Sequence, residues 1–191
     1  EMGARRAHES AAIAAARAAF IARFDATSNL EAGRSWGIPT MGTSAHSFTL
    51  LHDSEKEAFE AQIASMGPDT TLLVDTYDIT AAVKMAVELT GGEVAAVRID
   101  SGDLGSTAVE VRRQLDDLGA KQTKIVVTSD LDEYTIAALA AAPVDRFGVG
   151  TSLVTGSGHP TAGFVYKLVA HTDGAEWTEV AKTSKSKTNR G

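Results

Sequence analysis

"VAAVRIDSGDLGSTAVEVRRQLDDLG", residues 94–119, contains the pattern that decides the fold. It opens with an apolar run, and residues 106–119 then read as a helix that stops at a glycine. The apolar run ends in four polar residues: Arg98, Asp100, Ser101 and Asp103. Apolar runs without alternation are typical of strands buried on both faces in parallel sheets. The segment therefore predicts a strand–helix unit with polar side chains at the carboxyl end of its strand.

The same unit recurs on both sides of this segment. We expect strands over 71–78, 94–103, 124–130 and 146–153, and helices over 79–92, 106–119 and 132–143. Strands that alternate with helices of ten to fifteen residues predict βαβ units and a parallel sheet, and so the α/β fold class. Outside this region we expect helices over 8–23 and 53–67, turns over 26–37, and a short strand or extended loop over 38–48. Two further strands, 164–170 and 177–183, are expected with a turn at 172–174 between them.

All four strands of the repeating region end in polar residues, which we call the polar rim: residues 75–78, 98–103, 128–130 and 148–151. In α/β sheets and barrels, ligands bind at the carboxyl ends of the parallel strands. The shared rim favours an irregular TIM-like α/β barrel with parallel strands. A doubly wound sheet is the alternative that the sequence leaves open. The chain length favours a single domain over residues 1–191.

Composition excludes several classes of function. A formal charge of −7 and a pI near 5.2 argue against non-specific nucleic-acid binding, which needs a basic face. No apolar run approaches the roughly 20 residues that span a bilayer, and the absence of cysteine fits a cytoplasmic protein. Because Glu1 precedes the first methionine and no closing element follows residues 177–183, we expect a segment of a longer protein.

The rim residues have two interpretations each. The glycines of "RFGVGTSLVTG" allow backbone N–H groups and Thr151 to approach a phosphate, but a tight turn needs glycine equally. In "RIDSGD", Arg98 suits a phosphate, and the two carboxylates around Ser101 suit a sugar diol or Mg²⁺. Alternatively, Ser101 or Asp103 is the N-cap of the next helix. The helices after the neighbouring strands have similar cap candidates, which are Asp78 for one and Asp130 or Asp132 for the other.

Two residues are not explained by capping. Asp75 directly follows the apolar "LLV", and buried acids are almost never unpaired, so Asp75 needs a cation, a metal or a histidine. His46 lies among small residues in "GTSAHSF". A lone histidine is more often structural, but one beside carboxylates can serve as a base or accept a phosphoryl group. The basic run "KTSKSKTNR", with Lys182, Lys185, Lys187 and Arg190, is either a solvated tail or a loop that grips anions.

In order along the chain, these motifs resemble nicotinate phosphoribosyltransferases, which are type II phosphoribosyltransferases. The resemblance rests on "GARRAH", "ATSNLEAG", "GTSAHSF", "VDTYD", "RIDSGDL", "VTSDLDEY", "FGVGTSLVTG" and "KLV" followed by "VAKTSKSKTNRG". It implies the barrel part of a larger two-domain enzyme that works as a homodimer in the cytoplasm. The implied reaction joins nicotinate to 5-phosphoribosyl 1-diphosphate (PRPP) and needs Mg²⁺. It is coupled to ATP hydrolysis through a phosphohistidine.

The resemblance also implies roles for individual residues. His46 stands at the phosphorylated position, with Asp75 as a candidate to orient its imidazole and Asp100 in the catalytic group. The residues implied in binding nicotinate or PRPP are Arg5, Ser28, Arg98, Ser101, Asp103, Ser129, Asp130, Gly150 and Thr151. Met2 departs from the related nicotinamide enzymes, which have a phenylalanine there that stacks on the pyridine. The metal ligands are not assigned.

Three alternatives stay open. A nicotinamide or quinolinate phosphoribosyltransferase differs from the first interpretation in its base pocket. A phosphate-binding isomerase or aldolase belongs to another class, and none of the four polar rim segments contains a lysine for a Schiff base. A non-catalytic barrel fragment that binds phosphate is the third.

Overall fold

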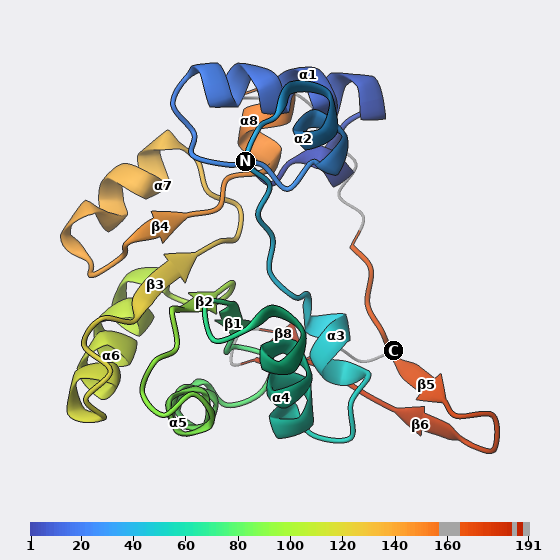
Figure 1. The fold of residues 1–191 in the computed structure, drawn as a ribbon, viewed down its shortest axis with the longest axis vertical. Helices are drawn as coiled ribbons and strands as arrows, with labels where there is room; N and C mark the ends of the chain where they lie inside the picture. The colour runs from blue at the N-terminus through green and yellow to red at the C-terminus, as the bar shows by residue number, and fades with distance from the viewer. Residues whose placement is uncertain (157–164, 185–186, 189–191) are drawn as a thin grey trace. The chain divides into compact units, whose positions relative to one another are not determined.

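The computed structural model describes residues 1–156, 165–184 and 187–188 (Figure 1). The chain divides into two compact units. Unit 1 comprises Glu1–Gly42, Thr128–Ala138 and Phe147–Val165, and unit 2 comprises Thr43–Val127, Leu139–Arg146 and Tyr166–Gly191. None of the helices in these described residues is long and apolar enough to cross a membrane.

The four-stranded sheet has its strands in sequence order: β1 (Thr71–Leu73), β2 (Ala96–Ile99), β3 (Lys124–Val127) and β4 (Arg146–Phe147). The β1–β2 and β2–β3 pairs are parallel, and they place Leu72 opposite Val97 and Val97 opposite Ile125. All three side chains are fully buried, as the unalternated apolar runs predict. Doubly wound sheets reverse their strand order at a switch point. The order β1–β2–β3–β4 contains no such reversal, so it favours the barrel type of arrangement.

Helices cover this sheet with small and branched apolar side chains. Figure 1 shows α5 (Ile79–Leu89) between α6 (Leu104–Asp117) and α4 (Glu55–Met66), and α5 packs against both. Their buried faces include Val83 and Val87 of α5 and Val111 and Leu115 of α6. Each helix begins at a side-chain cap: Ser54 for α4, Asp78 for α5 and Asp103 for α6. The sequence had indicated Asp78 as a cap, and it had left Ser101 or Asp103 open for α6.

The remaining elements of unit 2 are short. Helix α3 (His46–Leu50) packs against α4, and the 3₁₀ turn η2 spans Leu139–Ala141. Strands β5 (Ala170–Thr172) and β6 (Trp177–Glu179) form an antiparallel hairpin. Strands β7 (Thr183–Ser184) and β8 (Lys187–Thr188) form a second antiparallel pair.

Unit 1 is helical. The alanine-rich α1 (Glu9–Ile21) packs against η1 (Ala4–Arg6), α2 (Leu30–Trp36) and α8 (Thr151–Thr155), and α7 (Glu133–Ala138) completes the unit. Ala16 of α1, Ala32 of α2 and Ile38 form a small core. Because alanine side chains are short, the backbones of α1 and α2 approach closely. The sequence expectation of a helix over 8–23 is thus confirmed to within two residues.

Three expectations about local structure were wrong. Residues 26–37 contain α2, because Asn29 accepts a hydrogen bond from the Ala32 amide and Gly37 ends the helix with φ of 65°. The expected strand 146–153 stops at Phe147, and α8 begins at Thr151. The expected strand 164–170 starts only at Ala170 among the described residues.

The glycines of residues 146–153 explain the second error. A Cβ atom on Gly150 would lie 3.1 Å from the Met2 carbonyl oxygen, and one on Gly148 would lie 2.7 Å from the Met2 sulfur. Glycine is therefore needed here for close packing of the Glu1–Gly3 segment, which local sequence patterns do not reveal.

Candidate functional site

The carboxyl ends of β1 and β2 carry a cluster of ionisable side chains within unit 2. Asp75 lies two residues beyond β1, and Asp100 directly follows β2. Since the register pairs Leu73 with Arg98, both strands end at the same edge of the sheet. His46, the first residue of α3, and Lys182, which precedes β7, join them from distant segments. We call the following residues the His46 cluster: His46, Asp75, Thr76, Arg98, Asp100, Ser101 and Lys182.

Both ring nitrogens of His46 have polar neighbours. Nδ1 lies 3.1 Å from the Thr76 hydroxyl, and Nε2 lies 2.8 Å from the Lys182 ammonium. An ammonium group only donates hydrogen bonds, so Nε2 must accept and the imidazole must be neutral. The ring proton is therefore assigned to Nδ1, which donates to Thr76. Nε2 thus presents a lone pair, which is what a nucleophile or general base requires.

Asp75 is the buried anion of the cluster, with a side chain only 2% exposed. Its Oδ2 accepts hydrogen bonds from the Asp100 amide at 3.1 Å and from the Ser101 hydroxyl, and it lies 3.6 Å from the Lys182 ammonium. Its Oδ1 lies 3.8 Å from His46 Nε2 and accepts no hydrogen bond from any described residue. Asp75 therefore has the cation that its burial predicted, Lys182, and it also lies beside His46.

Arg98 and Asp100 form the second ion pair of the cluster, at 3.3 Å. The Arg98 Nη1 also donates to the Thr43 hydroxyl and, at 3.3 Å, to the Ser44 carbonyl oxygen. Asp100 Oδ2 lies 3.7 Å from His46 Nε2. The segment that leads into α3 thus binds the Arg98 guanidinium, and the Asp100 carboxylate lies beside the His46 imidazole.

These contacts give the cluster a defined chemical capacity. The Arg98–Asp100 and Lys182–Asp75 pairs balance two positive against two negative charges around a neutral imidazole. Cationic groups and hydroxyls suit phosphate oxygens, and carboxylates stabilise a developing cation such as an oxocarbenium carbon. A nucleophilic Nε2 at the same edge suits transfer of a phosphoryl group.

Comparison with known proteins gives the family. Residues 1–190 match the nicotinate phosphoribosyltransferase (NAPRTase) family. The chain belongs to this family. It is 60% identical over 177 residues to nicotinate phosphoribosyltransferase pncB1 of Mycobacterium tuberculosis, an alignment that covers 88% of the chain and 40% of that protein. It is 41% identical over 194 residues to nicotinate phosphoribosyltransferase of Bacillus subtilis, with coverage of 96% and 39%. The chain thus spans about 40% of the length of these NAPRTase relatives.

Two solved structures share the fold. The nicotinate phosphoribosyltransferase of Porphyromonas gingivalis aligns with a TM-score of 0.80 at 21% identity, over 98% of this chain and 55% of that one. The nicotinate-nucleotide pyrophosphorylase of Pyrococcus furiosus aligns with a TM-score of 0.75 at 30% identity, over 83% and 42%. The NAPRTase structures are TIM-like α/β barrel enzymes, so the expected fold class is confirmed.

The other residues singled out by the NAPRTase resemblance lie in unit 1 or outside the His46 cluster. In unit 1, the Met2 amide donates to the Val149 oxygen at 2.7 Å, and the Ser28 amide donates to the Glu1 oxygen at 2.8 Å. The segment that leads to Arg5 therefore lies between the Ser28 and Gly150 backbones. Six of the predicted residues belong to this unit: Arg5, Ser28, Ser129, Asp130, Gly150 and Thr151.

Two of the residues predicted to bind substrate, Ser129 and Asp103, are exposed but have different local structures. Ser129 is exposed and adopts φ of 117°, a conformation that is rare for residues other than glycine and often found at functional sites. Asp103 is exposed and accepts a hydrogen bond from the Ser106 amide at 3.1 Å, so it caps α6. A role for Asp103 in substrate binding stays a prediction.

Sequence reasoning did not identify two contacts of the His46 cluster. The group on Nδ1 is Thr76, whereas the sequence had suggested Asp75 as the orienting residue, and Thr43 receives the Arg98 guanidinium. Lys182 was noted only as part of a basic run. Of that run, Lys185 and Arg190 lie outside the described residues. No periodic pattern marks threonines or a single lysine as partners of a histidine so distant in sequence.

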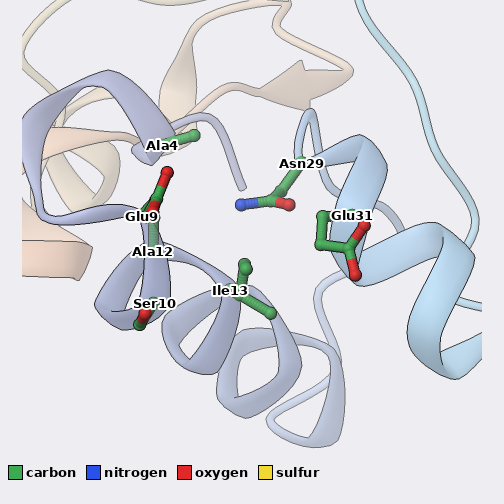
Figure 2. A pocket seen from close by; sticks show the side chains of 7 residues that line it. All are labelled: Ala4, Glu9, Ser10, Ala12, Ile13, Asn29 and Glu31. Carbon is green, nitrogen blue, oxygen red and sulfur yellow. The ribbon is translucent and has the colours of Figure 1, made fainter.

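A pocket in unit 1 does not have the chemistry of an anion site. It has a volume of about 360 Å³ and lies between α1 and α2, where Figure 2 shows Glu9, Asn29 and Glu31 around it. Two carboxylates disfavour a nicotinate carboxylate or a phosphate.

Among the described residues, no group of three or more histidine, aspartate or glutamate side chains is arranged to hold a metal ion.

Glu55, at the start of α4, is an acid in an unfavourable position. Its Oε1 is buried and accepts no hydrogen bond from any described residue. Burial, and then the negative charges of Asp78 and Asp75, raise the pKa of Glu55 to about 7. The pKa of the nearby Tyr77 is raised as well, first by burial and then by Glu55.

We predict that Glu55→Gln stabilises the protein at alkaline pH. The unfolded chain loses this proton near pH 4.5 and the folded protein only near pH 7, so the free energy of unfolding falls as pH rises between these values. Discounted for solvent screening, the gain at pH 8 is about 1–2 kcal/mol, and it vanishes below pH 4.5. Urea unfolding from pH 4 to 8 measures it, with Glu57→Gln, an exposed residue of the same helix, as the control. A gain that is independent of pH would contradict this.

Proposed function

We propose that the protein of which this chain is part is a nicotinate phosphoribosyltransferase. It forms nicotinate mononucleotide and pyrophosphate from nicotinate and PRPP, and it couples this reaction to ATP hydrolysis through a phosphate carried by His46. The observation that supports it most directly is the position of His46, whose Nε2 lies beside Lys182 and two carboxylates. Family membership and 60% identity to a protein of that name point to the same activity.

The residues of the His46 cluster have different roles in the two steps of the reaction. In the coupling step, a bond forms between a His46 ring nitrogen and the γ-phosphorus of ATP while the bond to the β-phosphate oxygen breaks, and ADP leaves. Arg98 and Lys182 supply positive charge to the phosphate oxygens at this edge. In the transfer step, Asp75 and Asp100 stabilise the positive charge that develops on the anomeric carbon as pyrophosphate leaves.

The residues also fit a magnesium ion bound mainly through substrate. Asp75 Oδ1 is a buried carboxylate oxygen without a hydrogen bond from a described residue, which is the type of ligand that Mg²⁺ takes. Mg²⁺ commonly uses one or two carboxylates together with substrate phosphates, which agrees with the absence of a three-residue metal group among the described residues. When bound, it neutralises charge on the departing pyrophosphate.

The residues of unit 1 complete the proposal. Arg5 and Ser28 contact the pyridine base, Ser129 and Asp130 the ribose, and Gly150 and Thr151 the 5-phosphate. The positive φ of Ser129 supports its assignment. Residues 1–191 form one barrel domain of the larger enzyme, which acts as a cytoplasmic homodimer.

Assays of the full-length protein test this function. With PRPP, Mg²⁺ and each of nicotinate, nicotinamide and quinolinate, we expect product only with nicotinate, at a rate that ATP increases. Product with nicotinamide, or carbon dioxide released from quinolinate, would assign the protein to one of the sister activities instead. If calorimetry detects PRPP binding but no pyridine reacts, the protein is a phosphate-binding module.

A further inference from the structure

Gln62 of α4 lies at the centre of a buried hydrogen-bond network behind the His46 cluster. Its side chain is 4% exposed, and Oε1 accepts a hydrogen bond from the Ser44 hydroxyl at 2.7 Å. Its Nε2 donates to the Thr70 hydroxyl at 2.7 Å and to the Thr71 carbonyl oxygen at 2.9 Å. Both amide protons and the amide oxygen are therefore in use, as a buried amide requires.

This network has one consistent polarity. The Thr71 carbonyl can only accept, so the amide nitrogen must face β1 and the amide oxygen must face Ser44. The Ser44 hydroxyl then has to donate to Gln62. A rigid α4 and the first residue of β1 thereby fix the position of Ser44, which lies in a segment without regular structure.

The segment that Gln62 fixes also holds the His46 cluster. Thr43 and the Ser44 carbonyl oxygen both accept hydrogen bonds from Arg98, and α3 with His46 begins two residues after Ser44. A displaced Ser44 would move the acceptors of the guanidinium. Because Arg98 also forms the ion pair with Asp100, its position bears on the anion-binding edge.

We infer that Gln62 is a positioning residue for PRPP binding, which acts through Ser44 on the Arg98 guanidinium. This inference rests on the proposed function, because it assumes that Arg98 contacts PRPP. Gln62 itself does not touch substrate. Loss of its hydrogen bonds should weaken the binding of PRPP and leave the rate of the chemical step unchanged.

Two substitutions that each remove one hydroxyl group beside Gln62 separate the positioning of Arg98 from the stability of the fold. Ser44→Ala removes the hydrogen bond toward the His46 cluster, and Thr70→Val removes one on the opposite side while Nε2 keeps the Thr71 carbonyl. In the full-length enzyme, Ser44→Ala should raise the KM for PRPP about fivefold, the value of one ordinary hydrogen bond, with kcat within twofold. Thr70→Val should lower Tm by a few degrees, as loss of one buried hydrogen bond does, and leave KM within twofold.

The outcomes distinguish the two levels of the proposal. Equal KM values for both variants and the wild type would overturn the role of Gln62 while the proposed function stands. If wild-type protein shows no PRPP binding by calorimetry, the proposed function itself fails. Gln62→Met, which removes the three hydrogen bonds at once, should combine the KM increase of Ser44→Ala with the Tm decrease of Thr70→Val. A Gln62→Met protein that folds with unchanged KM would overturn the inference.

Discussion

His46→Ala is expected to abolish the stimulation of nicotinate mononucleotide synthesis by ATP, with a loss of 100-fold or more in phosphate incorporation. The physical reason is that no other group of the cluster offers a neutral nitrogen lone pair: Lys182 is an ammonium that donates to Nε2, and Arg98 has no acceptor. Removal of a nucleophile eliminates the covalent step, whereas positioning of PRPP by the cationic groups persists. The basal reaction without ATP should therefore survive.

Mass spectrometry of the full-length protein after incubation with ATP measures the first part, as an acid-labile phosphate on His46. His52→Ala is the matched control, because His52 lies six residues further along and its Nδ1 contacts the Phe48 carbonyl oxygen at 2.8 Å. It should keep both the phosphate and the ATP effect. If His46→Ala retained full stimulation by ATP, the phosphohistidine mechanism would be refuted.

Asp75→Ala is expected to destabilise the protein by about 3–5 kcal/mol, the cost of breaking a buried ion pair by removing one partner. The variant leaves the Lys182 ammonium without its buried counter-ion and removes the acceptor of the Asp100 amide and of the Ser101 hydroxyl. Asp75→Asn keeps an oxygen for these two donors and removes only the charge. Its loss should be smaller.

Urea unfolding of the two variants beside the wild type measures this difference. Asp103→Asn is the control, since it removes a carboxylate charge from an exposed residue of another segment of the polar rim, and asparagine caps a helix as well as aspartate does. Its stability should stay within about 0.5 kcal/mol of the wild type, as for most surface substitutions. An Asp75→Ala protein as stable as Asp103→Asn would show that the buried pair contributes nothing to stability.

Much of the fold could be predicted because its signals are local. The apolar runs before Asp75 and Asp100 form β1 and β2, and Ser54, Asp78 and Asp103 cap the helices that follow them. Each of these features depends on side chains within a few residues of one another. The strand ends therefore predicted that Asp75 and Asp100 lie at one edge of the sheet.

Other features were missed because distant contacts decide them. The run "RFGVGTSL" has the composition of a strand, yet Gly148 and Gly150 pack against Met2, and a helix starts at Thr151. Helix α3 has no side-chain cap, so nothing in "GTSAHSF" marked its start at His46. In both cases the local pattern allowed two structures, and packing selected one.

The sequence by itself determined the α/β class, the strand order along the chain and the kinds of groups that follow each strand, because hydrophobic periodicity and capping act over single turns. Only the tertiary structure decided which neighbour each ring nitrogen of His46 has. These neighbours are Thr76 and Lys182, which is 136 residues away in the chain, at hydrogen-bond distances of 3.1 and 2.8 Å. Hydrogen bonds are sensitive to tenths of an ångström and to direction, and a sequence pattern specifies neither between segments so far apart.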